Sequence, residues 1–304
     1  MAITLIIFSI LVLSTICVAA MCYELTRQPA VRLSALDYVK LTFSGIIAFI
    51  ADTLGVGSFA VNVALAKLLG TFHDDELPSV NNGAQVIPGT IESFFFMYFV
   101  DVDLTTLLTL VLGTCVGGLI GGNVVSRLSK QAIRLGMICS FVAIIALLIC
   151  HQFRLMPVGG ELVELHSWKL VIGFFALVLC GIVTSVGGIG LFVMVQAVLF
   201  VLNVSPAVAF PIMTTAGAMQ QPITTLVFVQ HNKIPLKKTL ILSLAGCIGV
   251  FITMPIFTKL AVTWLHSLLL FILLFNLYVI SRTYLRARLK KSYLAENTSL
   301  LPAD

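Results

Sequence analysis

The amino-acid sequence predicts an all-α protein that crosses a membrane several times. Two properties of the composition support this fold class: 59% of the 304 residues are hydrophobic, and only 10% are charged. A soluble domain carries about 25% charged residues, which is far more than this chain offers for a water-covered surface. The third observation is local. No Asp, Glu, Lys or Arg occurs between Lys169 and Lys233, a stretch long enough for about three membrane passages.

Eleven hydrophobic segments follow one another, and we expect each to be helical because unpaired backbone groups in lipid cost several kcal/mol. They cover residues 3–22, 38–54, 58–70, 83–100, 104–124, 133–150, 168–186, 190–203, 207–229, 239–258 and 262–281. No Lys or Arg precedes the first segment, which favours a retained helix over a cleaved signal peptide. Segments 58–70 and 190–203 are short and follow glycine-rich breaks. We therefore predict about seven full spans plus two helical hairpins, built from nine to eleven segments.

Two parts of the chain repeat the same motifs in the same order. At the first glycine-rich break, the matching positions are Gly55, Gly57 and Phe59, which correspond to Gly188, Gly190 and Phe192 at an offset of 133. A Gly-Ala-x-x-x-Pro sequence at 83–88 then corresponds to 217–222 at an offset of 134. The shared order of the two motifs favours an internal repeat over chance similarity.

Loop charges indicate that the two copies are inserted in opposite orientations. The loop after the first Gly-Ala-x-x-x-Pro segment is acidic and the equivalent later loop is basic, with Asp101 and Asp103 against Lys233, Lys237 and Lys238. The next loop is basic in the first copy, with Arg127, Lys130 and Arg134, whereas the second copy has only Lys259. Basic loops mark the cytoplasmic side. The pattern therefore predicts an inverted repeat, as in many secondary transporters.

This inverted arrangement defines the predicted domains. They are an N-terminal helix with a cytoplasmic loop (1–37), the first repeat (38–151), an external linker (152–167), the second, inverted repeat (168–281) and a basic cytoplasmic tail (282–304). We expect a multi-pass protein of the cell (inner) membrane with an external N-terminus and a cytoplasmic C-terminus. Basic residues directly after a hydrophobic segment anchor a helix end, so we expect no nucleic-acid partner.

The glycine-rich breaks are candidate hairpin tips and a candidate anion site. Gly55 and Gly57 precede Ser58 in the first copy, and Gly188 and Gly190 occupy the second. A helix that begins at such a tip directs unpaired N–H groups and a positive dipole end toward a ligand. Two tips from opposite faces would bind an anion without Lys or Arg. The alternative is that the glycines only allow close helix packing.

Polar residues on the two proline-bearing segments form a second set of candidates. They are Asn81, Asn82, Gln85, Thr214, Thr215, Gln220 and Gln221. Amides and hydroxyls donate hydrogen bonds to oxyanions, and in apolar sequence they need partners. The alternative role is hydrogen bonding between helices. Asp52 and Glu92 are acids well inside hydrophobic segments, and they are candidates for taking up a coupling proton or cation. Capping by Asp52 and pairing of Glu92 within the bundle are the structural alternatives.

Motifs for enzymatic or metal chemistry are missing from the sequence. It contains no HExxH, GxSxG, Walker A or CxxC motif. The seven cysteines lie in or beside apolar segments and are interpreted as packing residues. We therefore expect no enzymatic activity, no metal and no cofactor.

A glycine-rich segment at 113–123 precedes the basic loop 126–130. With the two Gly-x-Gly breaks and the Gly-Ala segments, this makes the chain resemble the sulfite exporter TauE/SafE family of membrane permeases over about residues 38–281. The prolines that usually end the hairpin glycine runs of that family are absent, so the chain would be a divergent member. The resemblance implies transport of sulfur-containing anions such as sulfite, thiosulfate or organosulfonates.

The leading hypothesis is a secondary transporter for a small anion, working by alternating access with the anion held midway across the membrane at the two tips. Its expected partners are the anionic substrate, the lipid bilayer and a coupling proton or cation, and an oligomer is compatible with the sequence. The rival hypothesis is a membrane scaffold or assembly partner that transports nothing. An intramembrane enzyme ranks third, since no nucleophile–base pair is visible.

Overall fold

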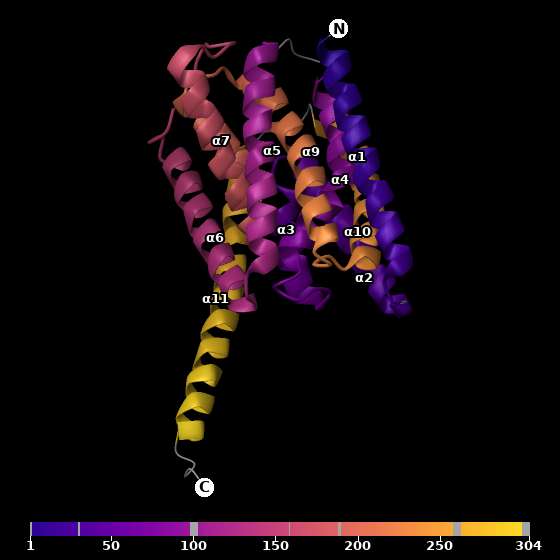
Figure 1. Cartoon of the computed structure of the whole chain (residues 1–304). Helices are drawn as coiled ribbons and strands as arrows, with labels where there is room; N and C mark the ends of the chain where they lie inside the picture. Colours follow the sequence, from indigo (N-terminus) through magenta and orange to yellow (C-terminus); the bar gives the residue numbers. More distant parts are fainter. Residues whose placement is uncertain are drawn as a thin grey trace.

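The computed structural model describes residues 2–29, 31–97, 103–157, 159–187, 190–257 and 263–299. Within these ranges the chain forms eleven α-helices and no strand, which confirms the all-α prediction. The helices pack side by side in a bundle. Helix α1 begins at one end of the bundle, and the last part of α11 protrudes from the opposite end (Figure 1).

The bounds of the helices follow the predicted hydrophobic segments. They are α1 (Ala2–Arg27), α2 (Ala35–Thr53), α3 (Ser58–Leu69), α4 (Leu77–Met97), α5 (Leu104–Arg127), α6 (Lys130–Gln152), α7 (Ser167–Gly187), α8 (Phe192–Val201), α9 (Pro206–Gln230), α10 (Leu236–Phe257) and α11 (Thr263–Ser299). Two helices have ends that lie furthest from the predicted bounds. Helix α4 starts six residues earlier, with Pro78 in its first turn, where the missing N–H removes no helical bond. Helix α11 continues through the basic segment after residue 281.

Six of the described helices are long and apolar enough to cross a membrane, judged by length and composition. They are α1, α5, α6, α7, α10 and α11, whereas α3 and α8 are apolar but shorter. The sequence predicts about seven full spans, and these are not the same helices as the six that qualify in the structure. Helix α7 qualifies although it is predicted as a hairpin leg. Helices α4 and α9, predicted as full spans, are not among the six.

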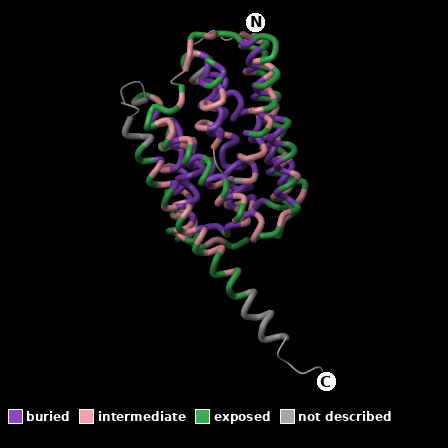
Figure 2. Tube along the Cα trace, turned by 90° about the vertical axis from the view of Figure 1, so that its left-hand side faces the viewer, coloured by how far each residue is buried: buried purple, intermediate pink, exposed green. Residues whose placement is uncertain are grey.

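The outside of the bundle is apolar, and polar side chains are buried inside it. Phe8, Phe175 and Phe271 each expose more than 60% of their surface. Figure 2 shows the buried positions along the inside of the bundle and the exposed positions along its outer surface. A large apolar surface is unfavourable in water and fits contact with lipid. The chain therefore has the character of a multi-pass membrane protein.

Side-chain caps fix several helix starts. Ser34 forms a capping box with Asp37 at the start of α2, and Ser129 and Ser205 cap α6 and α9. Asp103 caps α5 by accepting a 2.7 Å hydrogen bond from the Thr106 N–H. These backbone donors lower the pKa of the Asp103 carboxyl, because they stabilise its ionised form. The caps satisfy N–H groups that have no partner within the helix.

Glycines bring two pairs of helices into backbone contact. Helix α5 packs along α7, and α10 packs along α2. A methyl group added at Gly117 would lie 2.1 Å from the carbonyl oxygen of Val178, and one at Gly249 would lie 2.4 Å from that of Ile46. Both distances are too short for any side chain. Small residues that allow such approach are typical of helix contacts within membranes.

The chain reverses direction between α2 and α3. Gly55 and Gly57 adopt φ angles of 90° and 93° in the connecting turn, a conformation that residues with a side chain rarely adopt. The Lys40 ammonium donates to the Leu69 carbonyl at 3.0 Å, so the start of α2 lies beside the end of α3. The segment after α8 lies beside the one before α7, since the Ser205 N–H donates to the Leu162 carbonyl at 2.9 Å.

Candidate functional site

The described tip glycines of the two halves line one cavity. Gly55 and Gly57 from the α2–α3 turn and Gly190 from the start of the α8 region contribute to it. The remaining lining residues are apolar: Val56, Ala60, Ile144, Phe192, Val193, Leu269 and Leu273. The cavity measures about 20 Å³, which is room for about one water molecule. Gly188, also predicted at a tip, lies outside the described residues.

Asp52 organises a hydrogen-bonded cluster where α2, α3 and α4 meet. One of its carboxylate oxygens accepts the Ser58 N–H at 2.7 Å, and the other accepts the Gln85 side-chain amide. The Ser58 hydroxyl donates to the Gln85 carbonyl oxygen at 2.6 Å, which closes the ring of contacts. Asp52 thus holds the first N–H of α3, which the sequence predicts as a donor to an anion. In this conformation an acid of the protein takes that donor.

Glu92 extends this cluster along α4. The hydroxyl of Thr53, the residue after Asp52, lies 2.6 Å from Glu92 Oε1. Both acids are buried, with 5% of Asp52 and 3% of Glu92 exposed. The two candidate coupling residues, 40 positions apart in the sequence, therefore lie close together in the bundle.

The predicted asparagines of α4 make separate contacts. Asn81 accepts a hydrogen bond from the Asn62 amide on α3, and Asn82 donates to the Pro78 carbonyl one turn earlier at 2.8 Å. Asn276 of α11 donates to the Ala60 carbonyl at 2.8 Å. These contacts join α3 to α4 and α11, which is the structural alternative considered for the amide side chains.

The second half contains a neutral cluster between α7 and α9. The Gln220 amide donates to Thr224 Oγ1 at 2.7 Å and lies 3.3 Å from Ser185 Oγ. Thr214 donates to backbone carbonyls of its own helix, and the buried hydroxyl of Thr215 has no hydrogen-bond partner in the described structure. No ionisable side chain is present on α9.

The two clusters approach each other where α4 packs against α9. A methyl group added at Gly89 would lie 3.1 Å from the Gln85 side chain and 3.6 Å from Gln221 Oε1. Gln85 and Gln221 therefore flank the same glycine. Of the predicted polar residues, Gln85 and Gln221 thus come close to each other, and none of those on α4 and α9 lines the cavity between the glycines. Their part in binding stays a prediction.

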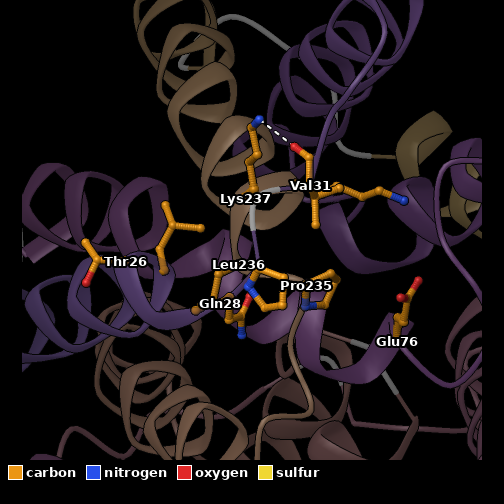
Figure 3. A pocket seen from close by; sticks show the side chains of 10 residues that line it. Thr26, Gln28, Val31, Glu76, Pro235, Leu236 and Lys237 are labelled. Atoms are coloured by element: carbon orange, nitrogen blue, oxygen red, sulfur yellow. Dashed lines mark hydrogen bonds between the residues drawn. The ribbon is translucent and has the colours of Figure 1, made fainter.

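A cavity of about 530 Å³ lies elsewhere, and none of the predicted site residues lines it. It is lined by the end of α1, the connector to α2 and the start of α10. Figure 3 shows Lys237 reaching across to the Val31 carbonyl, at 2.8 Å. Lys238 likewise donates to the Thr71 carbonyl. A second cavity of about 360 Å³ lies among Asp75, Lys130 and Lys233.

Ion pairs connect the loop before α4 to the start of α6. Buried Asp74 contacts both Lys67 and Arg134, with 2.7 Å to Arg134 Nε. Asp75 pairs with Lys130 at 3.1 Å. The sequence shows these charges but not their partners. The pair of Asp74 and Arg134, 60 positions apart, depends on how the bundle brings the loop before α4 to the start of α6.

Sequence reasoning also missed several polar residues of these contacts, among them Asn62, Ser185, Thr53, Thr224 and Asn276. Thr53 follows Asp52 directly, and Thr224 lies one helical turn after Gln220. Their positions beside predicted site residues could therefore have indicated them. Asn276 stands alone in an apolar segment, where its rarity is the only indication. Among the described residues, no group of three His, Cys, Asp or Glu could hold a metal ion.

The fold and surface define the class as an all-helical, multi-pass membrane protein. Comparisons with protein-family models, curated proteins and solved structures gave no match to this chain. The resemblance to the sulfite exporter TauE/SafE family therefore stays a prediction from the motifs.

Proposed function

We propose that the protein is a secondary transporter that moves a small anion by alternating access. The single observation that carries this proposal is the cavity shared by Gly55, Gly57 and Gly190. Two helix breaks far apart in the sequence face each other inside the bundle, and a scaffold would have no need of this arrangement. Such paired breaks supply backbone N–H groups to anions in other transporters.

The packing of the helices supports a repeat in the structure. Exchanging α2 with α7, α4 with α9 and α5 with α10 converts the main contacts between the two halves into one another. The pairs α5–α7 and α10–α2 are related in this way, as are α5–α9 and α10–α4. Cys115 and Gly117 correspond to Cys247 and Gly249 at an offset of 132, and both glycines approach a carbonyl of the partner helix.

The loops predicted to be cytoplasmic contact one another, which supports the proposed orientation. Lys237 joins the loop before α10 to the connector after α1. Lys238 joins it to the loop before α4, and Arg134 joins that loop to α6. Under the positive-inside rule this end is cytoplasmic. The C-terminus would then be cytoplasmic and the N-terminus external, in the cell (inner) membrane.

The substrate we propose is a sulfur-containing anion: sulfite, thiosulfate or an organosulfonate. The resemblance in the glycine-rich helix and the basic loop supports this class. A cavity of about 20 Å³ is too small for such an anion. We interpret the described conformation as an occluded one, in which the α2–α3 and α7–α8 units must separate before the anion enters.

Uptake of radiolabelled sulfite, thiosulfate and sulfonates into proteoliposomes tests this function. Gly190→Leu is the sharpest variant, because a Cβ added at Gly190 meets no atom within 4 Å and the backbone there needs no positive φ. The longer leucine side chain exceeds the cavity of about 20 Å³, so we expect it to fill this space and stop uptake, and the amount of folded protein is measured alongside. The control is Val116→Leu on the exposed face of α5, which should transport like the wild type.

A folded Gly190→Leu protein that retains full physiological function would favour the scaffold. The substrate assignment fails if the wild type moves none of these anions under a pH gradient of either sign.

A further inference from the structure

Two carboxyl groups lie close together inside the bundle. Asp52, near the end of α2, and Glu92, in the second half of α4, are both buried, and the hydroxyl of Thr53, the residue after Asp52, lies 2.6 Å from Glu92 Oε1. Two ionised carboxylates this close would repel each other in an apolar interior, where each is costly to charge. One of the two acids therefore keeps its proton.

The contacts of the two acids indicate where this proton resides. Both oxygens of Asp52 accept N–H donors, from the Ser58 backbone and the Gln85 amide. Such charge-assisted bonds favour an ionised Asp52. Glu92 contacts the hydroxyl of Thr53, whose single hydrogen is shared between Glu92 and the Phe49 carbonyl. Glu92 therefore has less support for a negative charge, and the proton belongs on Glu92.

We propose that Asp52 and Glu92 form a binding site for a single proton, carried by Glu92 beside Asp52, and that this proton is the ion coupled to transport. The coupling role rests on the proposed function, but the proton site does not. A metal cation fits poorly, since the N–H donors around Asp52 would face it with positive charge. Metal-binding triads of acidic, His or Cys side chains are also absent from the described part of the chain.

Few other ionisable groups face this pair. Helix α9 has none, and Lys67 near the far end of α3 is the only one on that helix. Cys247 of α10 lies close enough to interact with Glu92, and Lys237 and Lys238 stand in the first turn of α10. The charged residues of α1 are in its last turns, and Lys169 of α7 is in its first. The proton is therefore governed chiefly by the two acids.

Loss of the proton would change the packing of three helices. The O–H bond of Glu92 breaks, the electron pair stays on the carboxylate and the proton passes to water. Two negative charges then stand close together in an apolar interior, where repulsion is strong. Asp52 and Glu92 must separate, and Asp52 carries the start of α3 with it through the Ser58 N–H. Proton binding would thus control how the α2–α3 unit packs against α4.

Infrared spectroscopy of the purified protein in lipid nanodiscs tests the site without any substrate. Glu92→Gln places an amide donor where the acid hydrogen was, so it should fold and mimic the protonated state. We expect the wild type to show one buried protonated carboxyl at neutral pH, and Glu92→Gln to lose it. The control Glu161→Gln removes an exposed acid and should leave that signal unchanged.

A second variant keeps the test decisive if Glu92→Gln folds poorly. Asp52→Asn removes the negative charge beside Glu92, and the Glu92 signal should shift or disappear. The proposal is overturned if the wild type shows no protonated carboxyl, or if both variants leave the signal as it is.

Transport measurements then separate the two proposals. In proteoliposomes, anion uptake by the wild type should depend on the proton gradient, and uptake by Glu92→Gln should lose that dependence. If anion uptake depends on the proton gradient equally in both proteins, the coupling role is contradicted and the proposal of anion transport is not. A wild type that moves no anion contradicts the proposed function, and the infrared result still decides the proton site.

Discussion

The two buried polar clusters lie between α2 and α4 and between α7 and α9, and they differ in charge. In the first, a glutamine amide joins α4 to Asp52 of α2, and in the second Gln220 of α9 lies beside Ser185 of α7. Both use a glutamine, but only the first cluster contains acids. The first cluster thus holds the proposed proton site and the second is neutral, so any coupling would be asymmetric.

The largest effect is expected from removing the acid of the first cluster. Asp52→Ala leaves the Ser58 N–H and the Gln85 amide without partners in a buried place. An unsatisfied buried group costs about 1–3 kcal/mol, so we expect the free energy of unfolding to fall by about 3 kcal/mol. Reversible unfolding in mixed micelles measures it. A loss below about 1 kcal/mol would show that the cluster is not held by Asp52.

The glycine contacts test whether the halves are structurally equivalent. Gly117→Ala and Gly249→Ala each place a methyl group against a carbonyl of the neighbouring helix. Overpacking costs about 1–3 kcal/mol, and we expect a similar loss of thermal stability in both variants. Gly190→Ala is a suitable control, because its added methyl group meets no atom within 4 Å. A strong effect in only one half would contradict the repeat.

A smaller effect is expected at the contact between α11 and α3. Asn276→Leu removes the donor to the Ala60 carbonyl, and one buried acceptor loses its partner. We expect a loss of about 1 kcal/mol in unfolding free energy. Asn123→Leu on the exposed face of α5 is a matched control, since its amide donates only within its own helix. Equal stability of the two variants would mean that the contact contributes nothing.

The smallest effect is expected in the neutral cluster. Ser185→Ala removes a hydroxyl whose contacts to Gln220 and Thr224 are long, at 3.3 and 3.5 Å. Neutral hydrogen bonds between membrane helices average about 0.6 kcal/mol, so unfolding should change by about that amount. A loss of unfolding free energy as large as that of Asp52→Ala would show that the two clusters contribute equally to stability, against this prediction.

The sequence predicts the helices well because hydrophobicity alone determines them in a membrane protein. The eleven segments match eleven described helices, and the polar residues of α4 and α9 stand out from their apolar surroundings. The contacts that these polar residues make with each other were not predicted. The closeness of Asp52 and Glu92 depends on how the bundle brings the end of α2 beside α4, and the pair of Asp74 and Arg134 depends on how it brings the loop before α4 to the start of α6. Neither arrangement has a signal in a single sequence.

The turn between α2 and α3 shows a second reason why the helices are easier to predict than the side-chain contacts. Gly55 and Gly57 predict the break, and their positive φ angles confirm a turn that needs glycine. The sequence also predicts a free helix start that awaits an anion. Asp52, only six residues before Ser58, reaches back to that start and takes the donor. Local competition of this kind is resolved by side-chain geometry, which spacing alone does not give.

The most direct test of the account measures anion and proton uptake together in proteoliposomes containing the wild type or Glu92→Gln. If Asp52 and Glu92 couple proton binding to anion transport, the wild type accumulates a sulfur-containing anion under a proton gradient and takes up one proton with each transport cycle. In Glu92→Gln, a proton gradient should drive neither accumulation nor proton uptake. Two results would contradict proton-coupled anion transport. One is anion accumulation by the wild type without proton movement, and the other is no anion movement by the wild type under a proton gradient of either direction.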